Sequence, residues 1–272
     1  MSTSVRIGPS ASDKLRSLVR RGTGRRTDWT AYARAYDMLA DHNPAYRALI
    51  RGLDDFLGTI EPPRRILDIG AGTGNFTEVA ARRFPHSEIT VVEPDPGMMA
   101  VARTRLAGQG AVTFDENLLE DVRVEEPADL VICVHALYVM PGTEDRLREI
   151  RGFLRPGGHL YLVDIGRVLD LGDWRRFLFG ALVREVGLAK AIVTFWRGRE
   201  IARQNKAISR AQQEGRYWTH SGEDLARKVE AAGFEVIRQD SVYRGYSDLL
   251  VCRAVADDEG EGRMNERQKG TP

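Results

Sequence analysis

Short apolar runs alternate with amphipathic segments along the middle of the chain. The apolar runs have the length of strands and cover residues 65–68, 88–93, 112–114, 129–134 and 159–164. Between them lie segments in which apolar residues recur every three or four positions, the period of a helix, at 76–84, 97–106 and 143–154. Strands that alternate with helices in this way predict a parallel sheet with helical crossovers.

The two ends of this region differ from its middle. Residues 28–57 have a helical period throughout, and Asn43 followed by proline predicts that a second helix begins there. Near the other end, a helix is expected over 221–232. The runs 234–238 and 247–252 follow with no helix between them, so these two strands are expected to pair antiparallel with each other.

The composition is that of a globular protein, with 42% hydrophobic and 29% charged residues. The formal net charge of +1 creates no global field that would attract nucleic acid. Cys133 and Cys252 lie in apolar runs without a CxxC neighbour, which predicts buried thiols and neither a disulfide nor a metal site. The sequence shows no secretory signal and no run of about 18 apolar residues, so we expect a cytoplasmic protein.

Two tails are expected around one domain that spans residues 28–255. Residues 1–27 carry seven basic side chains against one acidic one, a net charge of +6. This basic segment is expected to be a flexible, solvated arm, with contact to an anionic lipid or nucleic acid as the alternatives. Residues 256–272 are polar and charged, which predicts a second flexible tail.

The strongest signal for function is a glycine loop after the first apolar run. Gly70, Gly72 and Gly74 occupy alternate positions between this run and the next helix. Glycine has no Cβ, so such a loop can turn sharply and approach a ligand closely, and the helix after it presents unpaired N–H groups. A dinucleotide fingerprint spaces its glycines differently. Asp68, just before the loop, suits a cationic ligand better than a pyrophosphate.

A second acid supports the same site. Glu93 ends the second apolar run and lies 19 residues after Gly74. In nucleotide-binding folds an acid at this place accepts hydrogen bonds from ribose hydroxyls. The glycine loop and Glu93 together therefore predict a site for a ligand that contains a ribose.

With these features the chain resembles the class I S-adenosylmethionine-dependent methyltransferases over residues 32–252. The motifs that carry the resemblance are Asp68-Ile69-Gly70-Ala71-Gly72-Thr73-Gly74, Glu93, Asp129 at the start of the fourth strand, and Leu154-Arg155-Pro156-Gly157-Gly158 before the fifth. The resemblance implies an α/β, Rossmann-like sheet of seven strands with the last strand antiparallel. It also implies a helical lid over residues 28–60 and S-adenosylmethionine as the cofactor.

The resemblance further implies which residues bind this cofactor. They are Tyr36, Asp68, Gly70, Gly72, Thr73, Gly74, Glu93, Pro94, Asn117, Leu118, Cys133 and Val134. Glu93 would hold the ribose, with Pro94 beside the adenine. Asn117 stands where many relatives have an aspartate that contacts the adenine amine, and its side-chain carbonyl can still accept a hydrogen bond.

Methyl transfer from a sulfonium depends mainly on alignment of the acceptor, and the sequence contains no strong catalytic signature. Three side chains are candidates for orienting the acceptor or taking its proton. His135 and Tyr138 follow the fourth strand, where Val139 replaces a histidine common in relatives. Tyr36 shares one face of the N-terminal helix with Tyr32. Ordinary aromatic packing is the alternative for each of these rings.

Residues 166–220 form a longer connection than a crossover requires and are expected to be a helical cap over the acceptor. Apolar side chains cover a broad arc of a helix expected over 171–199, and a narrower stripe is polar and largely basic. Residues 167–216 carry eleven basic against five acidic side chains. A homodimer surface and peripheral contact with a membrane are the alternatives for this helix.

These observations predict methyl transfer by in-line displacement to a small hydrophobic acceptor, such as a secondary metabolite, a quinone-like ring or an isoprenoid. Methylation of a lipid at a membrane surface and a non-catalytic, cofactor-binding role are the alternatives. Nucleic acid is not favoured as a substrate, because Cys133-Val134-His135 stands where base-modifying relatives carry other motifs.

Overall fold

A computed structural model of the chain describes residues 27–256, and within helix α2 it describes the backbone but not the side chains of residues 34–40. The expected tails, 1–27 and 256–272, therefore lie outside the described residues except for Thr27 and Ala256. No helix in the described part of the chain is long and apolar enough to cross a membrane.

The centre of the structure is a seven-stranded sheet in the order β3-β2-β1-β4-β5-β7-β6. Its strands are β1 (Arg65–Ile69), β2 (Glu88–Val92), β3 (Ala111–Asp115), β4 (Ala128–Val134), β5 (Leu154–Ile165), β6 (Phe234–Val242) and β7 (Ser247–Ala254). Strand β7 runs antiparallel to both β5 and β6, and the pairs from β3 to β5 are parallel. The predicted sheet with an antiparallel last strand is confirmed, and so is the pairing of the final two strands.

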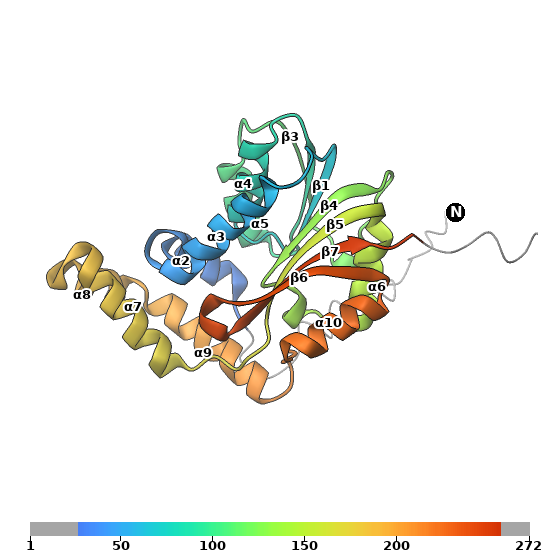
Figure 1. Ribbon diagram of the computed structural model, residues 1–272. Coiled ribbons are helices and arrows are strands. Elements are labelled where there is room, and N and C mark those ends of the chain that lie inside the picture. The colour runs from blue at the N-terminus through green and yellow to red at the C-terminus, as the bar shows by residue number, and fades with distance from the viewer. Residues whose placement is uncertain (1–26, 257–272) are drawn as a thin grey trace, which may run out of the picture.

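Helices cover both faces of the sheet (Figure 1). On one face lie α3 (Pro44–Leu57), α4 (Asn75–Arg83) and α5 (Pro96–Arg105), and on the other lie α6 (Thr143–Phe153) and α10 (Gly222–Ala231). Alternate residues of the strands enter the two core layers, with Ile66 and Ile132 in one and Leu67 and Cys133 in the other. Burial on both faces explains why the strands of this sheet are continuous apolar runs.

Two of the family motifs lie at the amino ends of the strands and serve the fold. The Asp129 carboxylate accepts hydrogen bonds from the backbone N–H groups of Arg64 and Arg65 and from the Arg155 guanidinium. It therefore ties together the starts of β1, β4 and β5. The Pro-Gly-Gly segment is part of β5, which begins at Leu154 and is longer than expected because Leu154 already pairs with Ala128.

The N-terminal helices α2 (Trp29–His42) and α3 divide at Asn43, as predicted. The Asn43 side chain accepts hydrogen bonds from the backbone N–H groups of Ala45 and Tyr46, and Pro44 fills the first position of α3. Helix α3 packs on α4, whereas α2 contacts α5, α7 and α9. Helix α2 therefore bridges the nucleotide half of the sheet and the helices that follow β5.

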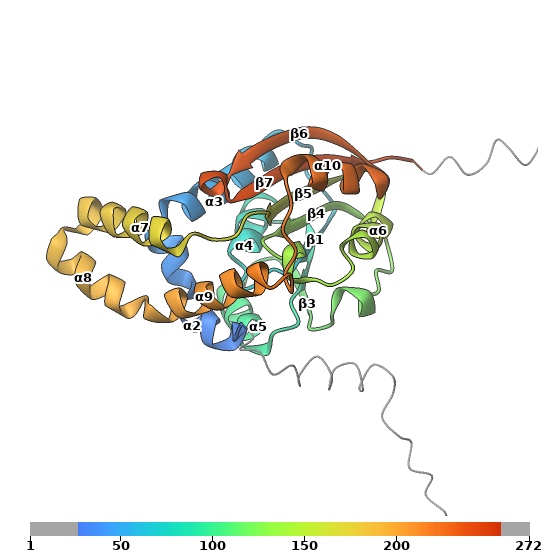
Figure 2. The same cartoon turned by 90° about the horizontal axis from the view of Figure 1, so that it is seen from below.

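The segment expected as one helix over 171–199 is not a single helix. It forms α7 (Leu171–Val186) and α8 (Leu188–Arg197), and α9 (Arg199–Gln213) follows. Gly187 separates the first two with a φ of +80°, a conformation that glycine adopts at low cost. In both views α7 and α8 project from the body of the molecule as a hairpin, and α9 returns to it (Figures 1 and 2).

Candidate functional site

The glycine loop turns at the carboxyl end of β1, where the strand order reverses between β1 and β4. Gly70, Gly72 and Gly74 all have positive φ, at +65°, +58° and +79°. A Cβ at Gly70 would clash with the Ala136 Cβ, and one at Gly74 would lie 3.3 Å from Leu106. A Cβ at Gly72 would have no atom within 4 Å. The outer two glycines therefore permit close packing, and Gly72 faces open space that a ligand can enter.

Glu93 follows β2 and lies next to this open position. One carboxylate oxygen accepts a hydrogen bond of 2.9 Å from the Gly72 N–H, and the other accepts one of 2.9 Å from the Asp95 N–H. The side chain is buried. Burial raises the pKa of Glu93 to about 7, although the two backbone N–H groups favour the charged form. Two hydrogen bonds thus hold Glu93 beside the glycine loop, and a pKa of about 7 means that its carboxyl group is partly ionised at neutral pH.

Asp68 is the second buried acid of this region. Its carboxylate accepts a 2.5 Å hydrogen bond from the Thr77 hydroxyl in α4. Burial raises its pKa to about 7, against the opposing effect of the bonds from Thr77. The Asp68 charge also contributes to the raised pKa of Glu93. A cation bound between these carboxylates would favour the ionised form of both.

The start of helix α2 packs directly against this site. The Thr30 hydroxyl donates to the Asp95 carboxylate at 3.1 Å, and Asp95 is two residues from Glu93. A Cβ at Gly97 would lie 2.7 Å from Thr30, so glycine at this position permits the close approach of α2 and α5. These contacts hold the start of α2 beside Asp95 and α5. Tyr36 belongs to α2, but its side chain lies outside the described residues.

The remaining expected cofactor residues divide into surface and core positions. Pro94 and Asn117 are exposed, Leu118 is half-buried, and the Asn117 N–H donates to Asp115 at 2.9 Å. Thr73, Cys133 and Val134 are buried. Cys133 packs in the core layer beneath α6 and α10, and burial raises the pKa of its thiol well above the ordinary value. The carboxyl ends of β1, β2, β3 and β4 bring all of these segments to one edge of the sheet.

The residues present fit S-adenosylmethionine. The open space at Gly72 suits a ligand that lies against the loop backbone, and the Glu93 carboxylate can accept hydrogen bonds from a ribose. Two buried acids close together suit a ligand that carries a positive charge, as a sulfonium does.

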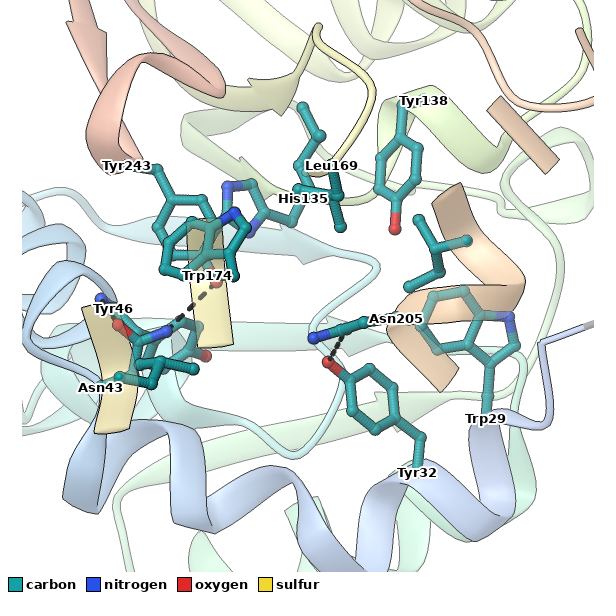
Figure 3. Close-up of a pocket in the computed structure, with 13 residues that line it drawn as sticks. Trp29, Tyr32, Asn43, Tyr46, His135, Tyr138, Leu169, Trp174, Asn205 and Tyr243 are labelled. Atoms are coloured by element: carbon teal, nitrogen blue, oxygen red, sulfur yellow. Dashed lines mark hydrogen bonds between the residues drawn. The ribbon is translucent and has the colours of Figure 1, made fainter. Parts of the chain in front are cut away.

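A pocket adjoins this edge beyond the ends of β4 and β5 (Figure 3). Helices α2, α3, α7 and α9 contribute to it, together with the loops after β4, β5 and β6. Its lining residues are Trp29, Tyr32, Asn43, Tyr46, His135, Tyr138, Ile165, Leu169, Trp174, Leu178, Asn205, Ile208 and Tyr243. Within the described part of the chain, no aspartate, glutamate, lysine or arginine lines the pocket.

Two hydrogen-bonded pairs are among the polar groups of this pocket. The Tyr32 hydroxyl donates to the Asn205 side-chain carbonyl at 3.0 Å, and the Asn43 amide donates to the Tyr243 hydroxyl at 3.3 Å (Figure 3). Each pair joins elements more than 170 positions apart in the sequence. The asparagine amides retain further capacity to donate or accept, so they can recognise a hydroxyl or carbonyl of a ligand.

His135 lines the pocket and has a strained backbone. Its φ is +54°, and its N–H donates to the Val163 carbonyl at 2.7 Å. The ring packs edge-on against Tyr243, with centroids 4.8 Å apart, and Nε2 lies 2.9 Å from the Ser247 hydroxyl. Burial lowers the pKa of His135 to about 3. The imidazole is therefore neutral at physiological pH and suits an orienting hydrogen bond better than proton uptake.

Tyr138 is the second expected catalytic residue in this wall. It belongs to the 3-10 turn η2 (Leu137–Val139), is buried, and packs edge-on against Tyr217 with centroids 5.6 Å apart. Its N–H donates to the Asp164 carboxylate at 3.1 Å. The structure thus brings His135 and Tyr138 to one pocket.

Several pocket residues had no functional signal in the sequence. Trp29, Asn43, Asn205 and Tyr243 come from four separate elements, and the local sequence pattern accounts for each residue as part of a helix face, a helix cap or a loop.

Phe177 and Phe195 of the expected cap do not line the pocket. Phe195 packs against Phe179 between α7 and α8, with ring centroids 5.5 Å apart.

Comparisons with known proteins agree with this architecture. The sequence model of the methyltransferase domain family matches residues 40–239. The ubiquinone/menaquinone biosynthesis C-methyltransferase of Cupriavidus metallidurans is 25% identical over 71% of this chain and 76% of that protein. The trans-aconitate 2-methyltransferase of Methylobacterium nodulans is 36% identical, over 36% of this chain and 37% of its own length. The chain thus spans less than two fifths of the first curated relatives that it matches.

Solved structures share the fold at low identity. The N-methyltransferase NodS of Bradyrhizobium japonicum, in complex with S-adenosylhomocysteine, superposes with a TM-score of 0.56 at 17% identity, over 83% of this chain and 98% of that one. A Burkholderia thailandensis 1,6-didemethyltoxoflavin N1-methyltransferase gives 0.56 at 16% identity, over 93% and 94% of the two chains. Because the family match covers more than half of the residues, the chain belongs to the methyltransferase domain family, which confirms its resemblance to the class I S-adenosylmethionine-dependent methyltransferases.

Proposed function

We propose that this protein transfers the methyl group of S-adenosylmethionine to a small, uncharged acceptor that contains a ring. The observation that carries the proposal is the pocket beyond β4 and β5, whose lining is aromatic and lacks charged side chains in the described part of the chain. Its flat walls include Trp174 and Tyr243, whose ring centroids are 4.7 Å apart. Such walls favour a planar, apolar ligand.

The same lining argues against a polycarboxylate acceptor. Trans-aconitate, named for several relatives, carries carboxylates, and proteins bind such groups with arginine or lysine. The pocket offers no such cation among its described lining residues, and the low pKa keeps His135 neutral. The acceptor of this protein is therefore of a different chemical class from the one in those names.

Binding and alignment account for the expected chemistry. When bound, S-adenosylmethionine supplies a methyl group on a positively charged sulfur. Glu93 and the Gly72 backbone would hold the cofactor end of the site, and α2 packs against α5 beside it. Asn43, Asn205 and His135 orient the polar group of the acceptor, which aligns it for in-line displacement. Methylation of a neutral hydroxyl would release one proton, with S-adenosylhomocysteine as the second product. Because the pKa of His135 is about 3, the imidazole orients the acceptor and the released proton passes to water.

Product analysis tests the proposal directly. The protein is incubated with methyl-labelled S-adenosylmethionine and a panel of neutral phenols, quinols and aliphatic polycarboxylates, and the products are identified by mass spectrometry. We expect label on neutral ring compounds only. Label on a polycarboxylate would contradict the acceptor class, and cofactor binding without any product from the panel or from cell extract would support the non-catalytic alternative.

Trp174→Ala is expected to lower kcat/KM for the acceptor about 10- to 200-fold, the usual worth of a lost pocket contact. Trp174 is buried and lines the pocket, so its removal leaves the acceptor poorly aligned. Cofactor affinity should change by less than about twofold. The matched control is Trp196→Ala, because Trp196 is exposed on α8 and does not line the pocket.

A less disruptive variant tests the same pocket in case Trp174→Ala does not fold. Leu178→Ala removes a half-buried pocket side chain from the same helix, α7, and should give a smaller loss in the same direction. Thermal melts confirm that each variant is folded. Unchanged acceptor kinetics in both folded pocket variants would show that the acceptor binds elsewhere.

Cofactor affinity is expected to fall as the pH decreases through about 7. The ionised Glu93 carboxylate would accept hydrogen bonds from the ribose hydroxyls, and the negative charges of Glu93 and Asp68 favour the positive charge of the cofactor. Burial raises the pKa of both carboxyl groups to about 7. Below that pH they take up protons, so affinity should fall by up to about tenfold per pH unit for each group. Calorimetry between about pH 6 and about pH 8 measures this, and Glu93→Gln should flatten the profile. An equally steep profile in Glu93→Gln would assign the effect to another group.

A further inference from the structure

Helix α8 carries an exposed apolar face at the tip of the hairpin. Among the described residues, seven large hydrophobic side chains are exposed, and four of them belong to α8: Leu188, Ile192, Val193 and Trp196. Their spacing places them on one side of the helix. Ala191 on the opposite side is fully buried. The apolar face of α8 is therefore turned outward, away from the core, and Trp196 is 67% exposed.

Positive charge lies along one edge and beyond the end of this face. Helix α8 contains Lys190 and Arg197, both exposed, and no acidic residue. Arg199 follows it, with its guanidinium 4.3 Å from the centroid of the Trp196 ring. The nearest acids in sequence are already paired, Glu185 with Arg47 and Glu200 with Arg203. An apolar strip with a basic border is complementary to a surface that is apolar inside and anionic at its boundary.

We propose that α8 docks on an anionic lipid bilayer and lies in its interface. Leu188, Ile192, Val193 and Trp196 enter the boundary between headgroups and acyl chains, and Lys190 and Arg197 contact lipid phosphates. Tryptophan suits this depth because its ring is apolar and its N–H is polar. The hairpin projects from the body, so α8 can reach a flat surface (Figures 1 and 2).

A second copy of the chain fits this face less well. In a two-fold dimer the same patch meets itself, and the basic border of one α8 would face the basic border of the other with no acid on either helix. A helix of 10 residues is about 15 Å long, and four side chains on it cover far less than the roughly 800 Å² per partner of a stable interface. Charge and area therefore both favour the bilayer.

This docking goes beyond methyl transfer, and one consequence rests on the proposed function. Helix α7 joins the two features, since Trp174 and Leu178 in its first half line the pocket and its far end leads through Gly187 into α8. A protein docked through α8 would hold its pocket within the length of α7 from the bilayer. An apolar acceptor dissolved in the membrane would then be concentrated near the pocket.

Vesicle co-sedimentation of the full chain tests the docking surface without any methyl acceptor. Wild type is expected to bind vesicles of phosphatidylcholine mixed with phosphatidylglycerol, and to bind pure phosphatidylcholine weakly. Binding should weaken with added salt. The double variant Ile192→Ser/Trp196→Ser should lower the partition coefficient about tenfold or more. The matched control, Ile237→Ser/Val255→Ser, removes exposed apolar side chains elsewhere and should bind as wild type does.

A charge pair of variants tests the basic border. Lys190→Glu/Arg197→Glu should lower binding to the anionic vesicles by at least about fivefold for each cation removed. The control Arg64→Glu/Arg82→Glu reverses two exposed cations away from α8 and should have a small effect. Sedimentation of the α8 variants at wild-type levels would overturn the proposal, because the basic N-terminal segment would then account for binding.

Two further measurements separate this proposal from its rivals. Analytical ultracentrifugation should give the same mass for wild type and Ile192→Ser/Trp196→Ser, and a dimer lost in that variant would assign α8 to a second copy. Cofactor affinity and turnover with a water-soluble acceptor should be unchanged in the α8 variants. Failure of methyl transfer in wild type would leave the vesicle result standing, so the two proposals fail independently.

Discussion

Gly72→Val is expected to abolish S-adenosylmethionine binding while the fold survives. The backbone at Gly72 has a φ of +58°, which costs an L-residue about 1–2 kcal/mol, a fraction of the roughly 5–15 kcal/mol that stabilises a domain. A Cβ at this position meets no protein atom within 4 Å, so valine would project into the open space of the site. Calorimetry should detect no binding, a loss of at least about 100-fold.

Gly108→Val is the matched control for this variant. Gly108 also has a positive φ, +80°, and a Cβ there likewise meets nothing within 4 Å. It lies in the turn between α5 and β3. Both variants should therefore lose similar stability in thermal melts, and only Gly72→Val should lose the cofactor. Retained affinity in a folded Gly72→Val protein would mean that the glycine loop serves the fold alone.

Glu93→Ala is expected to weaken S-adenosylmethionine binding by about 1.5–3 kcal/mol, the scale of hydrogen bonds to a charged group. The carboxylate is the acceptor for the ribose hydroxyls in the proposed site, and it also holds the Gly72 and Asp95 N–H groups. Alanine leaves both of these donors without their side-chain acceptor, so the glycine loop should loosen as well. Calorimetry measures the affinity, and hydrogen exchange at Gly72 reports the loosening.

Two further variants show whether the effect of Glu93→Ala comes from a lost ribose contact. Glu93→Gln keeps an amide oxygen as an acceptor and should lose less affinity than alanine does. Glu88→Ala, at the amino end of the same strand, removes a glutamate that pairs with Arg65 far from the site and should leave affinity unchanged. Equal losses at both ends of β2 would point to general destabilisation and against a ribose contact.

The sequence leaves open whether the acceptor is a small hydrophobic molecule or a lipid at a membrane surface. The pocket beyond β4 and β5 and the exposed face of α8 help to choose between these two classes. The pocket has no charged side chain among its described lining residues, which supports the proposed neutral ring acceptor, and the outward apolar face of α8 supports the proposed membrane contact. Under both proposals the acceptor would be a quinone-like ring compound that partitions into lipid. Methylation of an intact lipid requires in addition that the charged headgroup enter an uncharged pocket, which the desolvation of charge disfavours.

The sequence alone was sufficient for the fold and for the position of the glycine loop at the end of β1. Apolar runs that alternate with helical periods specify a parallel sheet, because burial on both faces makes each strand apolar throughout. The positive φ values at Gly70, Gly72 and Gly74 are a local requirement that the spacing of the glycines already encodes. Glu93 follows in the same way, since the end of the second strand must lie beside the loop after the first.

The sequence also contains a signal for the helix break at Gly187. A glycine in the middle of a helical pattern is a local signal for a helix end, but the continuous apolar arc of 171–199 favoured a single helix. The hairpin matters because it separates two sets of aromatic residues. Trp174 before the break lines the pocket, and Trp196 after it is exposed. Periodicity assigns both to an apolar face and cannot tell which neighbour that face meets.

Only the tertiary structure determined the pocket beyond β4 and β5. Asn43 and Tyr243 meet across 200 positions, and Tyr32 and Asn205 across 173, because α2, α3, α9 and the loop after β6 converge beyond the ends of β4 and β5. The neutral state of His135 likewise depends on its burial in this pocket and not on its place in the sequence. Local patterns encode backbone geometry and which face is apolar, whereas a pocket is formed by side chains from distant elements, and their packing decides its chemistry.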